Sequence, residues 1–266
     1  MFVQSVTRAV VALSILVAPV AAQGTLGAYA PAAAKFRLTS TQKTSQTMMG
    51  QSQDFETTSN QLLSLAVAKA SDALTLTMTL DSATVTTTAP TGAPDLSEAI
   101  GLKFVGAMTL DGKVTSSQVT DKTGAPSTSQ YAVNMKSILP RLRLGAAKGA
   151  TWVDSITSTG KQGDADVTAE SVLNFTLAGD TLMAGTTAWK IVSVSATKLT
   201  GKGSRMGADY TITGDVKGTT TSIVSTAGAF LGQLSETDSN LTVSVEAAGM
   251  TIPIVQHVTS KVDRVP

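Results

Sequence analysis

Two serine–lysine pairs have the spacing at which a lysine amine can activate a serine nucleophile. Ser158 with Lys161 and Ser195 with Lys198 both form Ser-x-x-Lys motifs. The chemistry needs both side chains on one face of a helix, one turn apart. Ser195 instead lies in an alternating stretch typical of a strand, where residues three apart point to opposite faces, and Ser158 lies beside Gly160 in a stretch typical of a turn. Neither pair predicts a catalytic site.

The acidic residues and the single histidine also lack the partners that catalysis would need. Two pairs of carboxylates stand two residues apart along the chain: Asp54 with Glu56, and Asp164 with Asp166. A glycosidase would set such carboxylates around a sugar-binding cleft, but aromatic residues, which stack on sugars, make up only 4% of the chain. His257 has no Gly-x-Ser-x-Gly motif with which to form a Ser–His pair. We therefore expect no catalytic residue, no metal site and no cofactor.

The composition excludes several other classes of protein. The chain has 266 residues and a mass of 27.2 kDa, enough for one large β domain or two small ones. Lys and Arg number 20 against 19 Asp and Glu, so we expect no nucleic-acid partner. The absence of Cys excludes disulfides and thiolate zinc sites. Thr occurs 41 times and Ser 27 times, a composition that suits the solvent-facing side of β-strands.

The N-terminus has the order of a secretory signal peptide. A basic start at Arg8 precedes an apolar run at 9–20, and small residues lead to Ala22. The run is shorter than the roughly 20 residues that a membrane-spanning helix needs. We expect residues 1–22 to be removed by cleavage after Ala22, with export to a bacterial periplasm or beyond. The mature chain would then not be an integral membrane protein.

Alternation of apolar and hydroxyl-bearing residues predicts a mainly β fold. Four apolar residues alternate with threonines, so an extended chain places them on one face; they are Leu74, Leu76, Met78 and Leu80. The same period occurs at 104–110, 173–177, 189–194, 210–213, 241–245 and 252–258. We expect an antiparallel, curved sheet, or an open barrel or sandwich, with one or two short helices. This single β-rich domain would cover residues 35–264, after a flexible lead-in at 23–34.

Turn signals separate the alternating runs at hairpin spacing. They occur at 111–112, 178–180, 201–203, 213–215 and 248–249, and the Asp-Gly pair at 111–112 is the strongest. An acidic cap at Asp95 predicts a short helix near 95–101, and a helical spacing ended by Pro140 predicts another near 130–139. Similar glycine-containing strands in both parts of the chain indicate a weak internal duplication, with halves near 35–145 and 146–264.

The stretch from Leu139 to Trp152 predicts a pinned junction between a helix and a strand. Pro140 ends the helix, Gly149 turns the chain, and Trp152 anchors the strand, with its ring buried and its indole N–H bonded. This stretch, with the strand–turn–strand at 106–114, resembles a secreted bacterial family, domain of unknown function 6263, in its Leu-Pro, loop and Gly-x-Thr-Trp. The resemblance implies an exported β-rich fold akin to the half-barrels of periplasmic lipoprotein carriers. It implies no catalytic residue and no ligand.

The expected function is the non-catalytic binding of an apolar or amphipathic ligand such as a lipid. A curved sheet leaves a concave apolar face, and the flexible methionine side chain adapts to varied ligand shapes. The candidate binding residues are Met48, Met49, Leu76, Met78 and Met108. The alternative for these residues is a place in the ordinary hydrophobic core.

A second hypothesis is a structural or adhesive surface protein whose Thr-rich β faces bind a partner or a polysaccharide. An outer-membrane barrel is disfavoured, because it would need girdles of aromatic residues. A hydrolase is disfavoured for want of a catalytic set. A cavity of several hundred Å³ would favour ligand binding, whereas a filled interior with an exposed apolar edge would favour adhesion. The oligomeric state is left open.

Overall fold

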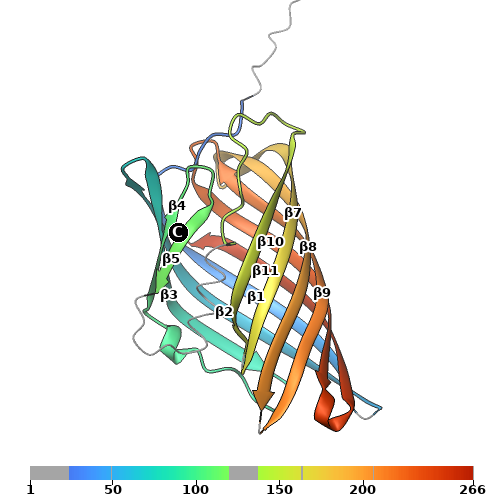
Figure 1. Cartoon of the computed structure of the whole chain (residues 1–266). Coiled ribbons are helices and arrows are strands. Elements are labelled where there is room, and N and C mark those ends of the chain that lie inside the picture. Colours follow the sequence, from blue (N-terminus) through green and yellow to red (C-terminus); the bar gives the residue numbers. More distant parts are fainter. Residues whose placement is uncertain (1–23, 49, 120–136, 163, 206, 266) are drawn as a thin grey trace, which may run out of the picture.

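The computed structural model describes residues 24–48, 50–119, 137–162, 164–205 and 207–265, which form one strongly curled antiparallel sheet (Figure 1). Its 11 strands are β1 (Ala32–Met48), β2 (Gln51–Ala70), β3 (Ala73–Thr87), β4 (Lys103–Met108), β5 (Val114–Val119), β6 (Thr151–Gln162), β7 (Ala165–Met183), β8 (Thr186–Arg205), β9 (Ala208–Ser225), β10 (Phe230–Val245) and β11 (Met250–Val265). Two short 3-10 turns, η1 (Ser97–Ala99) and η2 (Glu246–Ala248), lie between strands. In this described part of the chain, no helix is long and apolar enough to cross a bilayer. The predicted fold class is confirmed.

The first and last strands meet in the middle of the sheet. The order is β5-β4-β3-β2-β1-β11-β10-β9-β8-β7-β6, so β1 pairs with β11. That pairing runs from Lys35 opposite Val265 to Gln46 opposite Ile254. The two free edges are β5 and β6, which are consecutive strands in the sequence and lie on either side of the opening (Figure 1). The molecule is therefore a half-barrel, and we call its opening between β5 and β6 the seam.

Three of the predicted turns lie inside strands. They are 178–180 in β7, 201–203 in β8 and 213–215 in β9, strands of 19, 20 and 18 residues. At Gly179 the pairing of β7 with β8 contains a β-bulge. A Cβ on Gly203 would lie 2.5 Å from the Tyr210 ring, and a Cβ on Gly214 would collide with the backbone oxygen of Asn240. These last two glycines therefore serve close packing between strands and do not reverse the chain.

The predicted hairpin at 111–112 is present, but the predicted helices are not. β4 and β5 flank the hairpin turn, where Gly112 has a φ of 94°. The helix expected near 95–101 is reduced to η1, because Ile100 is already extended; the Asp95 carboxylate still accepts the Ser97 N–H at 2.9 Å. Of the helix expected near 130–139, residues 137–139 are not helical and the others lie outside the described residues. The internal duplication stays a prediction.

One end of the half-barrel is closed by two segments, residues 24–31 and 137–150, which we call the cap. The Leu26 N–H donates to the Ala146 carbonyl at 2.9 Å, which joins the two segments to each other. The Ala30 N–H donates to a carbonyl in the β9–β10 turn at 3.1 Å. The cap is thus bonded to itself and to the end of the sheet, and it covers the inner face there.

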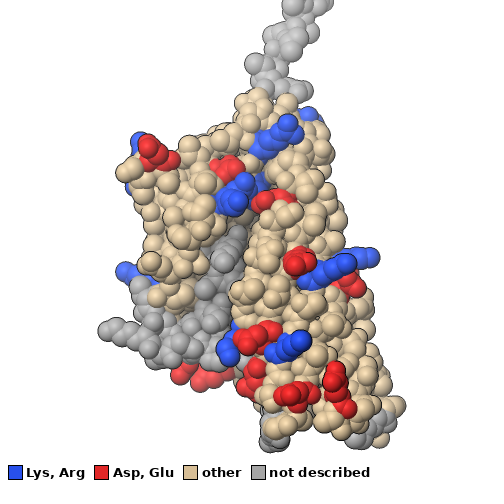
Figure 2. All heavy atoms as spheres, viewed as in Figure 1, with Lys and Arg blue, Asp and Glu red and all other residues tan. Residues whose placement is uncertain are grey.

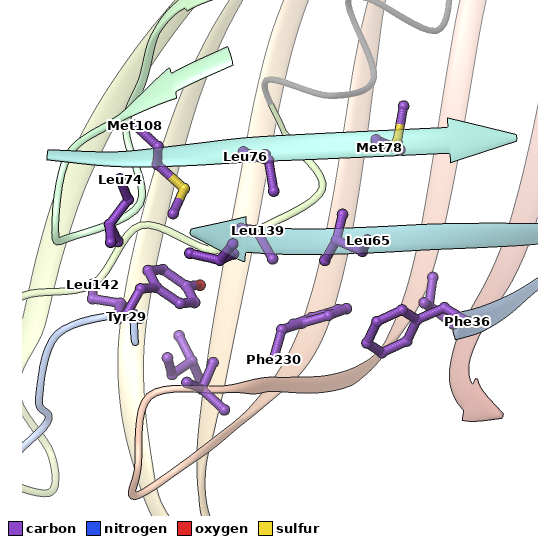
Figure 3. Packing of buried hydrophobic residues seen from close by; sticks show 14 of the residues in the cluster. Tyr29, Phe36, Leu65, Leu74, Leu76, Met78, Met108, Leu139, Leu142 and Phe230 are labelled. Atoms are coloured by element: carbon purple, nitrogen blue, oxygen red, sulfur yellow. The ribbon is translucent and has the colours of Figure 1, made fainter. Parts of the chain in front are cut away.

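The hydrophobic core lies beneath the cap (Figure 3). Leu26 and Tyr29 are 1% and 3% exposed, so residues 24–34 differ from the flexible lead-in expected at 23–34. Their Ala-, Gly- and Pro-rich composition conceals these two buried side chains. Tyr29 lies among Leu139, Leu142 and Phe230 in the close view. The inward residues of β3, none more than 2% exposed, complete the core: Leu74, Leu76, Met78 and Leu80.

Candidate functional site

A cavity of about 770 Å³ lies beside the seam. It is lined by both edge strands, by the cap and by the inner faces of β7 to β10, and 13 of its 23 lining residues are Ser or Thr. The polar side formed by β7 to β10 is called the hydroxyl wall below. It consists of Ser171, Ser193, Ser195, Thr197, Thr220, Ser222 and Gln233.

Strand register assembles the hydroxyl wall. Ser193 lies opposite Thr220 in the β8–β9 ladder, and Ser171 lies opposite Thr197 in the β7–β8 ladder. Alternate residues of a strand share a face, and neighbouring strands are about 4.8 Å apart, so these hydroxyls stand in rows. The hydroxyls of Ser171 and Thr197 are hydrogen-bonded at 2.7 Å. The wall therefore presents an array of groups that can each donate and accept a hydrogen bond.

Ser193 is the residue of the wall best placed to bind a ligand. It is 8% exposed, and its hydroxyl makes no hydrogen bond to another side chain or to the backbone of the described residues. Within the described part of the chain, every fully buried side-chain nitrogen or oxygen has a hydrogen-bond partner. The Ser193 hydroxyl is therefore open to the cavity, where a ligand can supply the missing partner.

The cavity also has an apolar end, which adjoins the hydroxyl wall. Phe175 and Leu173 on β7 lie opposite Ser193 and Ser195 on β8. Phe175 is only 3% exposed, and Leu139 of the cap also lines the cavity. Apolar and hydroxyl-bearing surfaces thus meet within one cavity, an arrangement that suits a ligand with an apolar part and a polar part.

Arg141 of the cap ties the two free edges of the sheet together. Its Nη2 lies 3.0 Å from Asp111 Oδ2 in the β4–β5 turn, and its Nε lies 3.3 Å from Asp154 Oδ2 in β6. The charge of Arg141 is therefore shared between two carboxylates, one on each side of the seam. Figure 2 shows basic and acidic side chains together near the capped end, where the two sides of the half-barrel approach each other.

The three predicted structural anchors all lie in this region. The Pro140 carbonyl accepts the hydroxyl of the buried Tyr29 at 2.8 Å. Gly149 turns the chain with a φ of 86°. Trp152 stacks on Phe175 with ring centroids 5.4 Å apart, and its indole N–H donates to the backbone carbonyl of a cap residue at 3.1 Å. Its ring is only part-buried, in contrast to the expected full burial, because β6 is an edge strand.

The pKa of Asp111 makes the stability of the seam depend on pH in the acidic range. Burial by itself raises this pKa, but a hydrogen bond from the Thr109 hydroxyl and the charge of Arg141 outweigh burial, so the pKa lies below its ordinary value. A carboxyl with a depressed folded pKa stabilises the fold above its unfolded pKa, about 3.9. That stabilisation is lost as the pH falls through the folded pKa.

We expect Asp111→Asn to unfold with a weaker pH dependence than the wild type between about pH 6 and about pH 2. Urea unfolding across this range measures the effect as the slope of the unfolding free energy against pH. Asp209→Asn, at an exposed position on β9, is the control and should follow the wild type. A steep wild-type slope that persists unchanged in Asp111→Asn would contradict the role given to this carboxyl.

Tyr29 makes the stability of the cap depend on pH in the alkaline range. Burial, and secondarily the negative charge of Asp111, raise the pKa of Tyr29 well above its ordinary value. The folded state therefore favours the neutral phenol. Its stabilisation is complete below the unfolded pKa, about 10, and is lost as the pH rises toward the folded pKa.

Tyr29→Phe is expected to lose about 1 kcal/mol of stability at neutral pH, because the hydrogen bond to the Pro140 carbonyl is removed. It should then lose less stability than the wild type between about pH 9 and about pH 11.5. Thermal unfolding of both proteins at the two pH values measures this change. If the difference in stability between the wild type and Tyr29→Phe is the same at both pH values, ionisation of Tyr29 does not oppose folding.

The predicted ligand-binding residues that the structure describes lie outside the cavity lining. Leu76, Met78 and Met108 are at most 1% exposed and belong to the core beneath the cap (Figure 3). Met48 is part-buried at the end of β1, and Met49 lies outside the described residues. The physical reason is the cap, which fills the concave apolar face that the sequence leads one to expect open. The first three residues therefore have the surroundings of ordinary core.

The serine–lysine motifs considered for catalysis lie in strands: Ser158 is inside β6 and not in a turn, and Lys161 of the same motif lies 3.7 Å from Asp166. Ser195 lines the cavity, whereas Lys198 is exposed. His257 is half-exposed, with Nδ1 2.8 Å from Asp238 Oδ1, and Asp166 is exposed. Among the residues that the structure describes, no three His, Asp or Glu side chains are grouped so that they could hold a metal ion.

The sequence of β8 alternates as expected for a strand, but over 192–197 the hydroxyl-bearing residues face inward and the valines face outward. Ser193, Ser195 and Thr197 alternate with Val192 and Val194. Alternation of this kind normally predicts an inward apolar face. Here the serine at 193 is 8% exposed and the valine at 194 is 53% exposed. Alternation over 192–197 alone would therefore indicate the wrong inner face, whereas Trp189 and Ile191, 6% and 1% exposed, share the inward face with Ser193.

Comparison with known proteins assigns no family. No family model matches the chain, and no curated protein matches it. Among solved structures, the chain is similar to the crystal structure of Pseudomonas aeruginosa OccK2 (OpdF), with 9% identity and a TM-score of 0.27 over 88% of this chain and 98% of that chain. A similarity this weak supports no conclusion about fold or function. The class is defined by the structure itself: an antiparallel half-barrel with a hydroxyl-walled cavity beside its seam.

Proposed function

We propose that this chain is an exported, non-catalytic protein that binds an amphipathic small molecule, such as a lipid, in the cavity beside the seam. The observation that carries the proposal is the meeting of the hydroxyl wall and the apolar end within one cavity of about 770 Å³. Ligand sites in proteins are typically concave, about 300–1,000 Å³ in volume, with apolar surface and a few well-placed polar groups.

The sequence supports the exported location in this proposal. Residues 1–22 have the order of a signal peptide, which favours a bacterial periplasm or the exterior. The resemblance of the 139–152 stretch to domain of unknown function 6263 favours kinship with envelope β proteins such as lipoprotein carriers. A carrier of this kind needs a cavity and no catalytic set.

Uptake of a fluorescent fatty acid by the purified chain tests the proposal. The wild type is expected to bind the probe saturably, at one site per chain. Ser193→Phe places a ring in the cavity and should weaken binding at least about tenfold. Val194→Phe is the matched control, because the neighbouring side chain points outward and is 53% exposed. It should bind like the wild type.

Circular dichroism of both variants establishes that they keep the β fold before their affinities are compared. Absence of saturable binding by the wild type would contradict the proposal and favour the structural or adhesive alternative. Equal losses of affinity in Ser193→Phe and Val194→Phe would place the bound probe somewhere other than this cavity.

A further inference from the structure

We infer that the polar head of the ligand is uncharged and carries several hydroxyl groups, as a glycosyl or other polyol head does. This inference rests on the proposed function, because it concerns the same cavity. It selects one class of amphipathic molecule against those with phosphate, sulfate or ammonium heads.

Among the described residues, three charged side chains line the cavity, and none of them belongs to the hydroxyl wall: Lys113, Arg141 and Asp154. Arg141 and Asp154 pair at 3.3 Å, and a second carboxylate, that of Asp111, lies 3.0 Å from the guanidinium. Lys113 is exposed in the β4–β5 turn, across the seam from the wall. A charged head against the wall would lose hydration without gaining an opposite charge, which is costly.

The hydroxyl wall offers the contacts that a polyol head needs. Serine and threonine hydroxyls donate and accept, as sugar hydroxyls do. The Ser193 hydroxyl is open to the cavity and unpaired within the described residues. The Gln233 carbonyl oxygen accepts the Ser222 hydroxyl at 3.3 Å, so the Gln233 NH₂ group remains as a donor. Rows about 4.8 Å apart match the separation of alternate equatorial hydroxyls on a pyranose ring.

The apolar end determines how the head joins the rest of the ligand. Phe175 lies directly opposite Ser193 in the β7–β8 ladder, and both are less than a tenth exposed. The apolar part of a ligand would thus begin one strand away from its hydroxyls. A glycolipid head and a free sugar share this hydroxyl chemistry, and their affinities separate them.

Calorimetric titration of the full chain compares three compounds that share an octyl tail and differ in the polar head: octyl glucoside, octyl sulfate and octyltrimethylammonium. Each compound is used below its micellar concentration. Octyl glucoside is expected to bind at least about tenfold more tightly than either charged compound. A charged compound that binds as tightly as octyl glucoside would overturn the inference and leave the proposed function standing. Absence of binding by all three would overturn both.

Gln233→Leu tests the wall itself. It should weaken octyl glucoside at least about fivefold and leave octyltrimethylammonium unchanged, because that head has no atom that can accept a hydrogen bond from the amide. Thr219→Val, at an exposed position on β9, is the control. Equal weakening of all three compounds by Gln233→Leu would overturn the head assignment, since a structural defect acts on every ligand alike.

Methyl glucoside distinguishes a free sugar from a glycolipid as the source of the head. Affinity within about threefold of that of octyl glucoside indicates a free sugar, and weaker affinity indicates a glycolipid.

Discussion

Trp152→Ala is expected to lower the free energy of unfolding by about 3 kcal/mol, the lower end of the usual range for emptying an aromatic core site. The lower end applies because the ring is part-buried on an edge strand. The substitution removes the stack on Phe175 and the hydrogen bond from the indole to the Arg141 carbonyl. Arg141 then loses one of the contacts that hold it across the seam.

Two measurements check the role of Trp152. In a Trp189→Phe background, its fluorescence should be blue-shifted relative to free indole, and Trp152→Ala should lower the urea midpoint. Trp152→Phe is the matched variant: it keeps one aromatic ring to stack on Phe175 and loses the N–H and the second ring, so it should cost at least about 1 kcal/mol and less than Trp152→Ala. Emission typical of a water-exposed indole, together with an unchanged midpoint in Trp152→Ala, would instead favour a surface role for this residue.

Gly112→Ala is expected to destabilise the chain by about 3 kcal/mol, the upper end of the range for overpacking. Gly112 has a φ of 94° in the β4–β5 turn, where an L side chain is strained. A Cβ there would also lie 2.6 Å from the Tyr29 ring and 3.0 Å from the Pro140 carbonyl oxygen. The methyl group would therefore push the cap away from the sheet.

Gly185→Ala is the matched control for this prediction. Gly185 has a φ of 77° and no atom within 4 Å of its ideal Cβ position, so alanine there adds backbone strain alone. It should cost about 1 kcal/mol. Urea unfolding of both variants separates the strain from the collision. Equal costs at the two positions would mean that the cap yields to the methyl group and does not pack tightly on this turn.

The sequence predicts the core strand and the main hairpin because both depend on local pattern. Leu74 to Leu80 alternate apolar and hydroxyl-bearing side chains, and the apolar set is buried. The Asp-Gly pair at 111–112 forms a turn because glycine tolerates a positive φ. These features need no information from distant parts of the chain.

The sequence does not predict the cap, because its burial depends on distant partners. Leu26 and Tyr29 stand alone among small residues, without a period. They are buried only because the 137–150 segment folds over the same end of the sheet. The pairing of β1 with β11 is equally non-local. The concave apolar face expected around Met78 is filled for this reason.

The hydroxyl wall is hard to predict because the inward face of its strands is apolar in one part and polar in another, as at Ile191 and Ser193 of β8. Alternation gives the period of β8 but does not say which face lies inward, and the usual choice places Val194 in the core. Three strands must come into register before the hydroxyls of Ser171, Ser193 and Thr220 form one surface. Glycines inside β8 and β9 further conceal how far these strands extend.

Native mass spectrometry of the chain, purified without detergent from the cells that produce it, shows whether the cavity beside the seam holds a ligand. We predict a population carrying one bound amphipathic molecule per chain, and loss of that population in Ser193→Phe but not in Val194→Phe. An empty wild-type chain that also takes up no fluorescent fatty acid would contradict the claim that the cavity beside the seam is a binding site.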